Sequence, residues 1–310
     1  MGSKLAFGEK KCKGKVSVLG APNHLFIFGL GYSARFLARK VLSEGWQVTG
    51  TCQSQEKAAD LALDGITPII FDRDHPIAGL AEAFNGVTHI LNSVPPDKIG
   101  DPVADLIAAH PDAFSKVKWI GYLSTTGVYG DTGGALVNET APRRPTSDRS
   151  RRRVEAEDAW LDLHSHAKMP VHLFRLPGLY GPGYSVLDRI RAGEAKNIVK
   201  PGHAFCRIHV DDLAQTLCAS MDRPNPGAIY NVCDDEPAPP SELTLFGCQL
   251  LGVEPPASQN WDDILPTLSP MALSFWQDNR RVDNSRIKED LDIELLYPSY
   301  REGLTEIAKI

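Results

Sequence analysis

Short apolar runs alternate with longer amphipathic stretches from residue 24 onwards. The first run, HLFIFGLG, predicts a buried strand that ends in glycines, and SARFLARKVLSEG after it repeats apolar residues at helical spacing until Gly45. Further strands are predicted at WQVTGTC, ITPIIFD, VTHILNSVPP, KWIGYLSTT and VHLFRLPGLYG. Strands that alternate with helices need crossover connections, so the pattern predicts an α/β fold with a doubly wound parallel sheet.

The rhythm changes after YGPGYSVLDRIRAGE, where proline-rich pieces such as DDEPAPPSEL interrupt the pattern. We therefore expect a flexible tail over residues 1–22 and a first domain over 23–178 that regains a strand near 228–233. Most of 179–310 is expected to form a small C-terminal lobe. Ligands of such sheets bind at the carboxyl ends of the strands, which here face the lobe.

Composition narrows the classes of partner. The 310 residues carry a net charge of −6, which provides no basic field for a nucleic acid. No apolar run approaches the roughly 20 residues of a membrane span, and the opening residues lack the apolar core of a secretory signal, so a cytoplasmic protein is expected. The six cysteines are scattered without clustered histidines, which favours free thiols in a reducing compartment and no metal site; they are Cys12, Cys52, Cys206, Cys218, Cys233 and Cys248.

The glycines after the first strand carry a specific pattern. FIFGLGYSARF matches G-x-G-x-x-A, between a predicted strand and a predicted helix, as Gly29, Gly31 and Ala34. Gly29 permits the tight turn, Gly31 lets the backbone approach a pyrophosphate, and Ala34 lets helix and strand pack closely. Tyr32 and Ser33 supply N–H groups at the helix start, where an anion is favoured. The motif predicts a Rossmann dinucleotide site; the alternative is an ordinary turn.

The end of the second predicted strand, TGTCQSQEK, bears on which dinucleotide is bound. An NAD site usually has a carboxylate here for the ribose 2′-hydroxyl, but no acidic residue precedes Glu56. Gln53, Ser54, Lys57 and Arg35 instead suit a 2′-phosphate, unless they are merely solvated surface residues. NADP is therefore favoured, with NAD as the alternative.

Three further residues complete the predicted cofactor site. Asp72 closes the third strand, where it accepts a hydrogen bond from the adenine amino group or stabilises a turn. Ser93 and Pro95 follow the fourth strand. Both positions lie at carboxyl ends of strands, where dinucleotides bind.

Several motifs in order resemble one superfamily. GLGYSA, YLSTTGVYG (122–130), FRLPGLYGPG (174–183), RIHVDDLA (207–214) and YNVCDDEP (230–237) are similar to the extended short-chain dehydrogenases/reductases, in the NAD-dependent epimerase/dehydratase group and its atypical YeeZ-like branch. The resemblance covers residues 24–310. It implies a bound nicotinamide cofactor, a small-molecule substrate in the lobe and a homodimer.

The resemblance also points to a hydroxyl at the end of the fifth strand. The superfamily has a serine or threonine three residues before the valine of V-Y-G, and Thr125 holds that place. A hydroxyl there binds a substrate oxygen during acid–base chemistry beside a hydride transfer. Ser124 and Thr126 are close alternatives, and all three also suit the end of a plain strand.

The superfamily's Tyr-x-x-x-Lys pair is missing. Glu157 fits the glutamate that follows this pair, which places Arg153 at the lysine and Arg149 at the tyrosine. Residues 131–179 contain no tyrosine, and their only lysine is Lys168. Arginine holds a ribose well but does not give up its proton near neutrality.

Two interpretations of the arginines stay open. Arg149 and Arg153 line the site and favour an anionic substrate, or they join Glu157 in an ion-paired, solvated helix face. Replacement proton donors at strand ends are Tyr129, Tyr180, Asp131 and His209; Asp211 is expected to cap the helix after His209.

The favoured function is an NAD(P)-dependent oxidoreductase or epimerase of atypical active site, acting on a small polar substrate. Relatives that bind nucleotide-sugars use an arginine four places before the histidine of IHV, but Phe205 stands there. This departure disfavours a nucleotide-sugar epimerase. The alternative is a catalytically silent NADP-binding sensor or scaffold.

Overall fold

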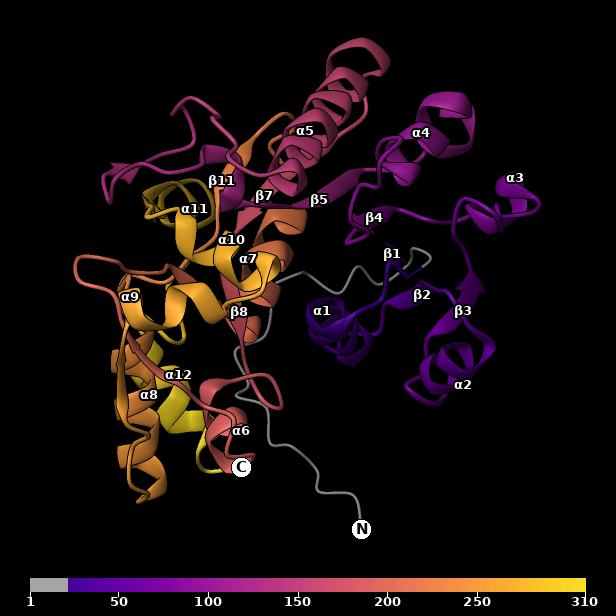
Figure 1. Cartoon of the computed structure of the whole chain (residues 1–310). Helices are drawn as coiled ribbons and strands as arrows, with labels where there is room; N and C mark the ends of the chain where they lie inside the picture. Colours follow the sequence, from indigo (N-terminus) through magenta and orange to yellow (C-terminus); the bar gives the residue numbers. More distant parts are fainter. Residues whose placement is uncertain (1–21) are drawn as a thin grey trace.

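The computed structural model describes residues 22–310, apart from the side chains of 270–272 and 274. Residues 1–21, which include Cys12 and all but the last residue of the tail predicted for 1–22, lie outside the described part of the chain. At the centre is a seven-stranded sheet with the order β11-β7-β5-β4-β1-β2-β3 (Figure 1). Its strands are β1 (His24–Phe28), β2 (Gln47–Cys52), β3 (Thr67–Ile70), β4 (His89–Asn92), β5 (Trp119–Thr125), β7 (Val171–Leu176) and β11 (Ile229–Asn231).

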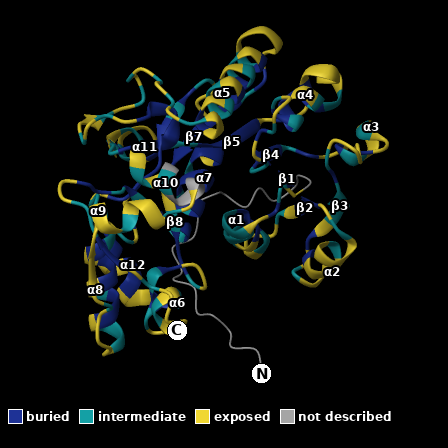
Figure 2. Cartoon of the chain, viewed as in Figure 1, coloured by how far each residue is buried: buried dark blue, intermediate teal, exposed yellow. Residues whose placement is uncertain are grey.

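All neighbouring strands of this sheet pair in parallel. Helices cover both faces, which confirms the predicted doubly wound α/β fold. One face carries α3 (Leu80–Ala83), α4 (Pro102–Ala109), the 3₁₀ helix η1 (Pro111–Phe114) and α5 (Asp148–Ala167). The other carries α1 (Tyr32–Ser43), α2 (Gln55–Leu63), α7 (Val210–Asp222) and α11 (Ser285–Leu291). Each face encloses an apolar core, and Figure 2 shows the strands buried between them.

The lobe is built from separate pieces of the second half of the chain. Its strands pair as β8 (Gly178–Tyr180) with β10 (Arg207–His209) and β9 (Asn197–Val199) with β12 (Ser258–Asn260). Its helices α6 (Val186–Arg191), α8 (Pro240–Leu251) and α12 (Tyr300–Ile307) enclose a third apolar core. Between β12 and the C-terminal helices lie α9 (Trp261–Ile264), η3 (Leu265–Thr267) and α10 (Pro270–Gln277).

Three further short elements are η2 (Thr126–Tyr129), β6 (Leu136–Val137) and β13 (Arg281–Val282). η2 follows β5, and β6 pairs in parallel with β13. The strand β11 lies at the edge of the large sheet although it follows the lobe strands β8, β9 and β10 in sequence. The domain boundary at residue 178 stays a prediction.

The start of α7 corrects one expectation. His209, and not Asp211, caps this helix, because the Nδ1 of His209 accepts a hydrogen bond from the N–H of Asp211 at 3.2 Å. Asp211 is the second residue of α7, where the positive end of the helix dipole stabilises its negative charge.

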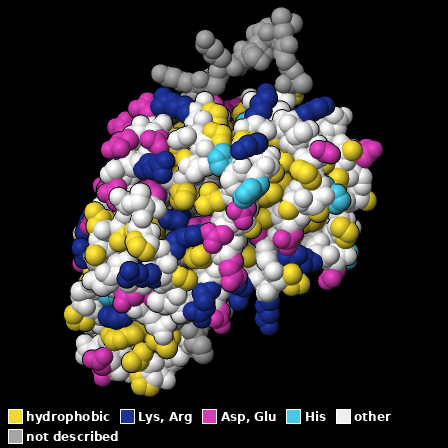
Figure 3. All heavy atoms as spheres, turned by 90° about the horizontal axis from the view of Figure 1, so that it is seen from above, with side chains coloured by type: hydrophobic (Ala, Val, Ile, Leu, Met, Phe, Trp, Pro, Cys, Tyr) yellow, Lys and Arg dark blue, Asp and Glu magenta, His cyan; other side chains and the backbone are white. Residues whose placement is uncertain are grey.

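The helices and the surface agree with the composition. Of the helices in residues 22–310, none has the length and apolar character needed to cross a membrane. On the face drawn in Figure 3, lysine and arginine side chains are mixed with aspartate and glutamate.

A buried histidine in β7 makes stability depend on pH. His172 is fully buried, its Nε2 accepts from the N–H of Asn225 at 2.9 Å, and burial lowers its pKa to about 4. The unfolded chain, with a histidine pKa of about 6.5, binds more protons below that pH, so stability falls as the pH drops from about 6.5 towards 4. We expect this histidine to contribute a loss of about 3 kcal/mol over that range.

Urea unfolding of the wild type and His172→Gln between neutral and acid pH measures this loss. The pH slope should flatten in His172→Gln, while His166→Gln, at an exposed histidine, should leave it unchanged. Equal slopes in all three proteins would contradict the assignment.

Candidate functional site

The glycine turn has the geometry that its motif predicts. Gly29 has a φ of +75°, and its N–H donates to the Thr51 hydroxyl at 2.8 Å. A Cβ at Gly29 would lie 2.9 Å from Cγ2 of Val94, so only glycine fits the turn. Gly31 precedes the first turn of α1, and a Cβ there would meet no heavy atom within 4 Å. The turn therefore opens onto free space beside the start of α1.

The first residues of α1 serve two purposes. The N–H groups of Tyr32 and Ser33 precede the first intrahelical hydrogen bond, which Arg35 donates to Gly31, so they remain for an anion. The Tyr32 ring turns to the lobe, where its hydroxyl donates to the carbonyl of Pro182 at 3.1 Å. Burial raises the pKa of this phenol. Tyr32 therefore ties the glycine turn to the Y-G-P-G loop.

The predicted adenosine-side residues lie at the carboxyl ends of β2 and β3. Ser54 caps α2, where its hydroxyl accepts from the N–H of Lys57 at 3.3 Å, and Gln53 beside it is exposed. Asp72 stabilises a turn by accepting hydrogen bonds from the ring and the N–H of His75, and these bonds lower its pKa. The turn role is thus observed, while contacts of Gln53, Ser54, Arg35 and Asp72 with a cofactor stay predictions.

The loop after β4 is anchored from beneath. The N–H of Ser93 donates to the carbonyl of Phe28 at 2.9 Å, and the buried amide of Asn92 donates to Asp101 at 3.0 Å. Asp101 in turn caps α4 by accepting from the N–H groups of its first turn. Ser93 and the exposed Pro95 therefore start from a fixed position beside the glycine turn; their cofactor role stays a prediction.

The three candidate hydroxyls at the end of β5 differ in burial and in hydrogen bonding. Ser124 is buried and donates to Oε1 of Glu157 at 2.7 Å, and Thr126 is 5% exposed. Thr125 is half-buried and accepts from the N–H of Gly127 at 3.1 Å. Because that contact uses an oxygen lone pair, the Thr125 proton stays available for a ligand oxygen.

Behind β5 lies a buried ion pair that the sequence did not reveal. Arg175 and Glu157 are 2% and 0% exposed, and Nη2 of Arg175 lies 2.8 Å from Oε2 of Glu157. Arg175 also donates to the Tyr129 hydroxyl at 2.8 Å, and Tyr129 donates to Asn231 at 2.7 Å. Glu157 is therefore no member of a solvated helix face, which corrects that alternative.

The two arginines at the places of the missing pair behave differently. Nη1 of Arg153 donates to the carbonyl of Leu123 at 2.8 Å and to the Tyr122 hydroxyl at 2.9 Å. The guanidinium is thereby held against the carboxyl-terminal half of β5. Arg149 is exposed, and its guanidinium lies over the Phe275 ring of α10 at 6.0 Å. The structure thus places Arg153 beside β5 and turns Arg149 towards α10.

The hydroxyl of Ser150, near Thr125, was not predicted from the sequence. A Cβ at Gly127 would lie 2.9 Å from Oγ of Ser150 and 3.4 Å from Oγ1 of Thr125. Ser150 is 8% exposed and accepts from the Ser147 hydroxyl at 3.0 Å. It follows Arg149 directly, one residue after the place of the missing tyrosine. Both hydroxyls therefore border the space that a side chain at Gly127 would occupy.

The four replacement proton donors all have structural roles. Tyr129 belongs to the buried network behind β5, and the Tyr180 hydroxyl donates to the carbonyl of Ser299 at 3.3 Å. His209 caps α7. Asp131 accepts from the N–H groups of Gly133 and Asn279, which lowers its pKa. These hydrogen bonds account for the positions of the four side chains without any catalytic role.

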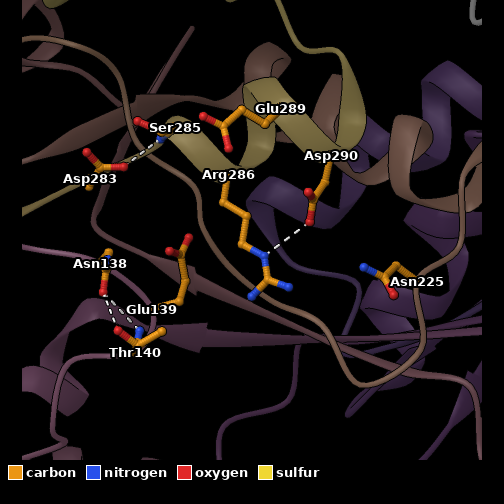
Figure 4. Close-up of a pocket in the computed structure, with 9 residues that line it drawn as sticks. All are labelled: Asn138, Glu139, Thr140, Asn225, Asp283, Ser285, Arg286, Glu289 and Asp290. Carbon is orange, nitrogen blue, oxygen red and sulfur yellow. Dashed lines mark hydrogen bonds and ion pairs between the residues drawn. The ribbon is translucent and has the colours of Figure 1, made fainter.

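A cavity of about 450 Å³ lies elsewhere, between the loop after β6 and α11 (Figure 4). Arg286 crosses it and donates to the carbonyl of Ile229, so the cavity follows the outer edge of β11. This edge strand is four places from β1 in the sheet, far from the glycine turn. We interpret Arg286 and its neighbours as a polar cover of the sheet edge; the lining is Asn138, Glu139, Thr140, Asn225, Asp283, Ser285, Arg286, Glu289 and Asp290.

Known proteins share both sequence and fold with this chain. Residues 100–233 match the NAD dependent epimerase/dehydratase family. Protein YeeZ of Escherichia coli (strain K12) is 29% identical over 287 residues, which are 88% of this chain and 95% of YeeZ. A functionally unknown conserved protein from Silicibacter pomeroyi DSS has a solved structure that is 43% identical, with a TM-score of 0.83, covering 93% of this chain and 98% of that one.

Residues 100–233 of this chain therefore resemble that family, while the likeness to YeeZ and to the Silicibacter pomeroyi protein runs along most of the chain. The predicted resemblance to the NAD-dependent epimerase/dehydratase group and to YeeZ is confirmed. The matched range holds Thr125 and both arginines, while the glycine turn precedes it. UDP-glucuronic acid 4-epimerase from Bacillus cereus, solved with UDP-glucuronic acid and NAD, shares the fold: its TM-score is 0.74 at 14% identity, over 92% of this chain and 99% of that one.

Within residues 22–310, no three histidine, cysteine, aspartate or glutamate side chains gather as metal ligands.

Proposed function

We propose that this protein is an NAD(P)-dependent oxidoreductase or epimerase that acts on a small polar substrate. The observation that carries the proposal is the Thr125 hydroxyl, half-buried at the carboxyl end of β5 with its proton uncommitted. A donor in that position stabilises negative charge on a reacting oxygen.

The residues at the glycine turn fit a dinucleotide. The free space at Gly31 admits a pyrophosphate, and the first N–H groups of α1 face it with the positive end of the helix dipole. We favour NADP, because Gln53, Ser54 and Arg35 stand where an NAD site has a carboxylate. When bound, the nicotinamide supplies or accepts the hydride.

The chain's own groups would share the remaining work. Thr125 would bind the reacting oxygen, and Arg153 would hold the nicotinamide ribose with the guanidinium nitrogens that β5 leaves unused. The Ser147 hydroxyl donates to Ser150, and this short chain of hydroxyls borders the same space beside Gly127 as Thr125 does. Such a chain passes a proton along without itself being an acid near neutrality, which suits a site whose customary phenol is missing.

Charge supports a substrate that carries an anionic group. Arg149 and Arg153 project from the first turns of α5, and guanidinium binds carboxylate with two parallel hydrogen bonds. Phe205 replaces the arginine of nucleotide-sugar-binding relatives, and its ring packs edge-on against His203 and Trp276. This apolar replacement favours a smaller substrate than a nucleotide-sugar.

The test begins with binding. Purified protein is titrated with NADPH and NADH while tryptophan fluorescence is followed, and is then mixed with a panel of carbonyl compounds, with and without carboxylates, while nicotinamide absorbance is recorded. We expect tighter binding of NADPH and turnover of acidic carbonyl compounds. Binding without turnover across the panel would favour the silent sensor or scaffold instead.

Removing the Thr125 hydroxyl is the sharper test of the site. Thr125→Val keeps the shape of the side chain, and turnover should fall by about 100-fold or more while the dissociation constant of NADPH stays unchanged. Thr140→Val, at an exposed hydroxyl that bonds only to Asn138, is the matched control. Undiminished turnover in Thr125→Val would remove Thr125 from the mechanism.

A further inference from the structure

Two cysteines that are distant in sequence meet where the sheet joins the lobe. Cys206 directly precedes β10, and Cys233 follows β11. Both are free thiols, 6% and 0% exposed, and they belong to one small apolar cluster with Val128 and Val282. The main chain holds them together, because the N–H of Asp234 donates to the carbonyl of Arg207 at 2.7 Å.

Both sulfurs bond to the same residue of β13. The N–H of Val282 donates to Sγ of Cys206 at 3.4 Å, and Sγ of Cys233 donates to the carbonyl of Val282 at 3.3 Å. In an extended strand the N–H and C=O of one residue point to the same side. The two sulfurs therefore lie side by side along the edge of β13 that faces away from β6.

The surroundings make the two thiols unequal. The neighbouring Cys233 side chain, the N–H of Val282 and the guanidinium groups of Arg207 and Arg280 lower the pKa of Cys206 to about 7. The neighbouring Cys206 side chain and burial raise the pKa of Cys233, with Asp234 and Asp235 adding to the effect. The lowered pKa favours a thiolate at Cys206, beside a protonated thiol at Cys233. Pairs in which one cysteine attacks and the other resolves have the same arrangement.

We propose that Cys206 and Cys233 are a redox modification site, which hydrogen peroxide converts reversibly to a disulfide. This inference goes beyond the proposed function and does not depend on it. Peroxide is hardly larger than water, so the small exposed part of Cys206 suffices for access.

The chemistry balances in two steps. The Cys206 thiolate attacks one peroxide oxygen, the O–O bond breaks, and the leaving hydroxide takes up a proton to become water, while Cys206 becomes a sulfenic acid. Cys233 then passes its proton to the sulfenic hydroxyl and attacks the sulfur of Cys206, so that the S–O bond breaks and a second water leaves. In sum, two thiols and one peroxide give a disulfide and two waters.

Oxidation of the two cysteines would change the hydrogen bonding of the segment around β13. The disulfide has no S–H to donate, so the carbonyl of Val282 loses its bond from Cys233. The same segment contacts the V-Y-G turn, since Arg280 donates to the carbonyl of Gly130 at 3.0 Å. A change at β13 is therefore transmitted to the loop that follows Thr125.

The experiment uses the full chain with Cys12→Ser, which removes the thiol outside the described residues. Folded protein receives one equivalent of hydrogen peroxide, remaining thiols are alkylated in denaturant, and peptides are analysed by mass spectrometry. We expect a cross-linked peptide pair containing Cys206 and Cys233, loss of two hydrogens, and full reversal by dithiothreitol. The initial rate should rise about tenfold between pH 6 and 8 as the Cys206 thiolate forms.

Matched variants distinguish the two roles. In Cys233→Ser, Cys206 should stop at the sulfenic acid, which dimedone traps, and in Cys206→Ser, Cys233 should stay reduced. Cys248→Ser removes another buried thiol and should leave the cross-link unchanged. Circular dichroism checks that each variant is folded, and Cys206→Ala serves if the serine variant is not. The proposal is overturned if folded protein keeps both thiols, or if Cys206 reaches the sulfinic acid with Cys233 present and reduced.

Discussion

Replacing Arg175 with methionine is expected to lower the free energy of unfolding by about 3 kcal/mol. The substitution leaves the carboxylate of Glu157 fully buried without its main partner. Ser124 still donates to Oε1, and Arg143 keeps a contact of 3.3 Å with Oε2, so the loss should lie near the lower end of the range for broken buried pairs. Urea unfolding at neutral pH measures the change.

Two controls separate burial from charge. Arg301→Met removes a guanidinium that is 45% exposed and paired with Glu236, and it should cost less than about 1 kcal/mol. The double variant Arg175→Met with Glu157→Leu removes both charges, and its loss should be smaller than the sum of the two single losses. A loss for Arg175→Met no larger than that for Arg301→Met would show that the buried pair adds little to stability.

Gly31→Val should abolish dinucleotide binding while the protein stays folded. The valine side chain would project into the free space beside the start of α1, where the pyrophosphate is expected, and its Cβ would meet no described heavy atom within 4 Å. Gly31 has a φ of −89°, which valine adopts readily. The dissociation constant of NADPH should rise by about 100-fold or more, a loss of about 2.7 kcal/mol.

Fluorescence titration and thermal unfolding test this expectation together. Gly31→Ala, which adds one methyl group, should weaken binding by an intermediate factor. An unchanged dissociation constant in Gly31→Val, at an unchanged melting temperature, would show that no dinucleotide phosphate approaches this turn.

Local features of the chain were predictable. The alternation of apolar runs gave the parallel sheet and its helices, because both periodicities depend on neighbouring residues alone. The glycine turn was predictable for the same reason, since a positive φ at Gly29 demands a particular residue. The cap of α7 was misassigned to Asp211, because histidine is an unusual cap and aspartate a common one.

The sequence by itself determined the fold class, the resemblance to the epimerase/dehydratase family and a strand end that carries three consecutive hydroxyls. Only the tertiary structure decided that Ser124 is committed to Glu157, that Thr125 keeps its proton, and that Ser150 lies beside it. It also brought Cys206 to Cys233 and Arg175 to Glu157. These pairings join elements far apart in the chain, and non-local contacts depend on how whole strands and helices pack, which no local periodicity records.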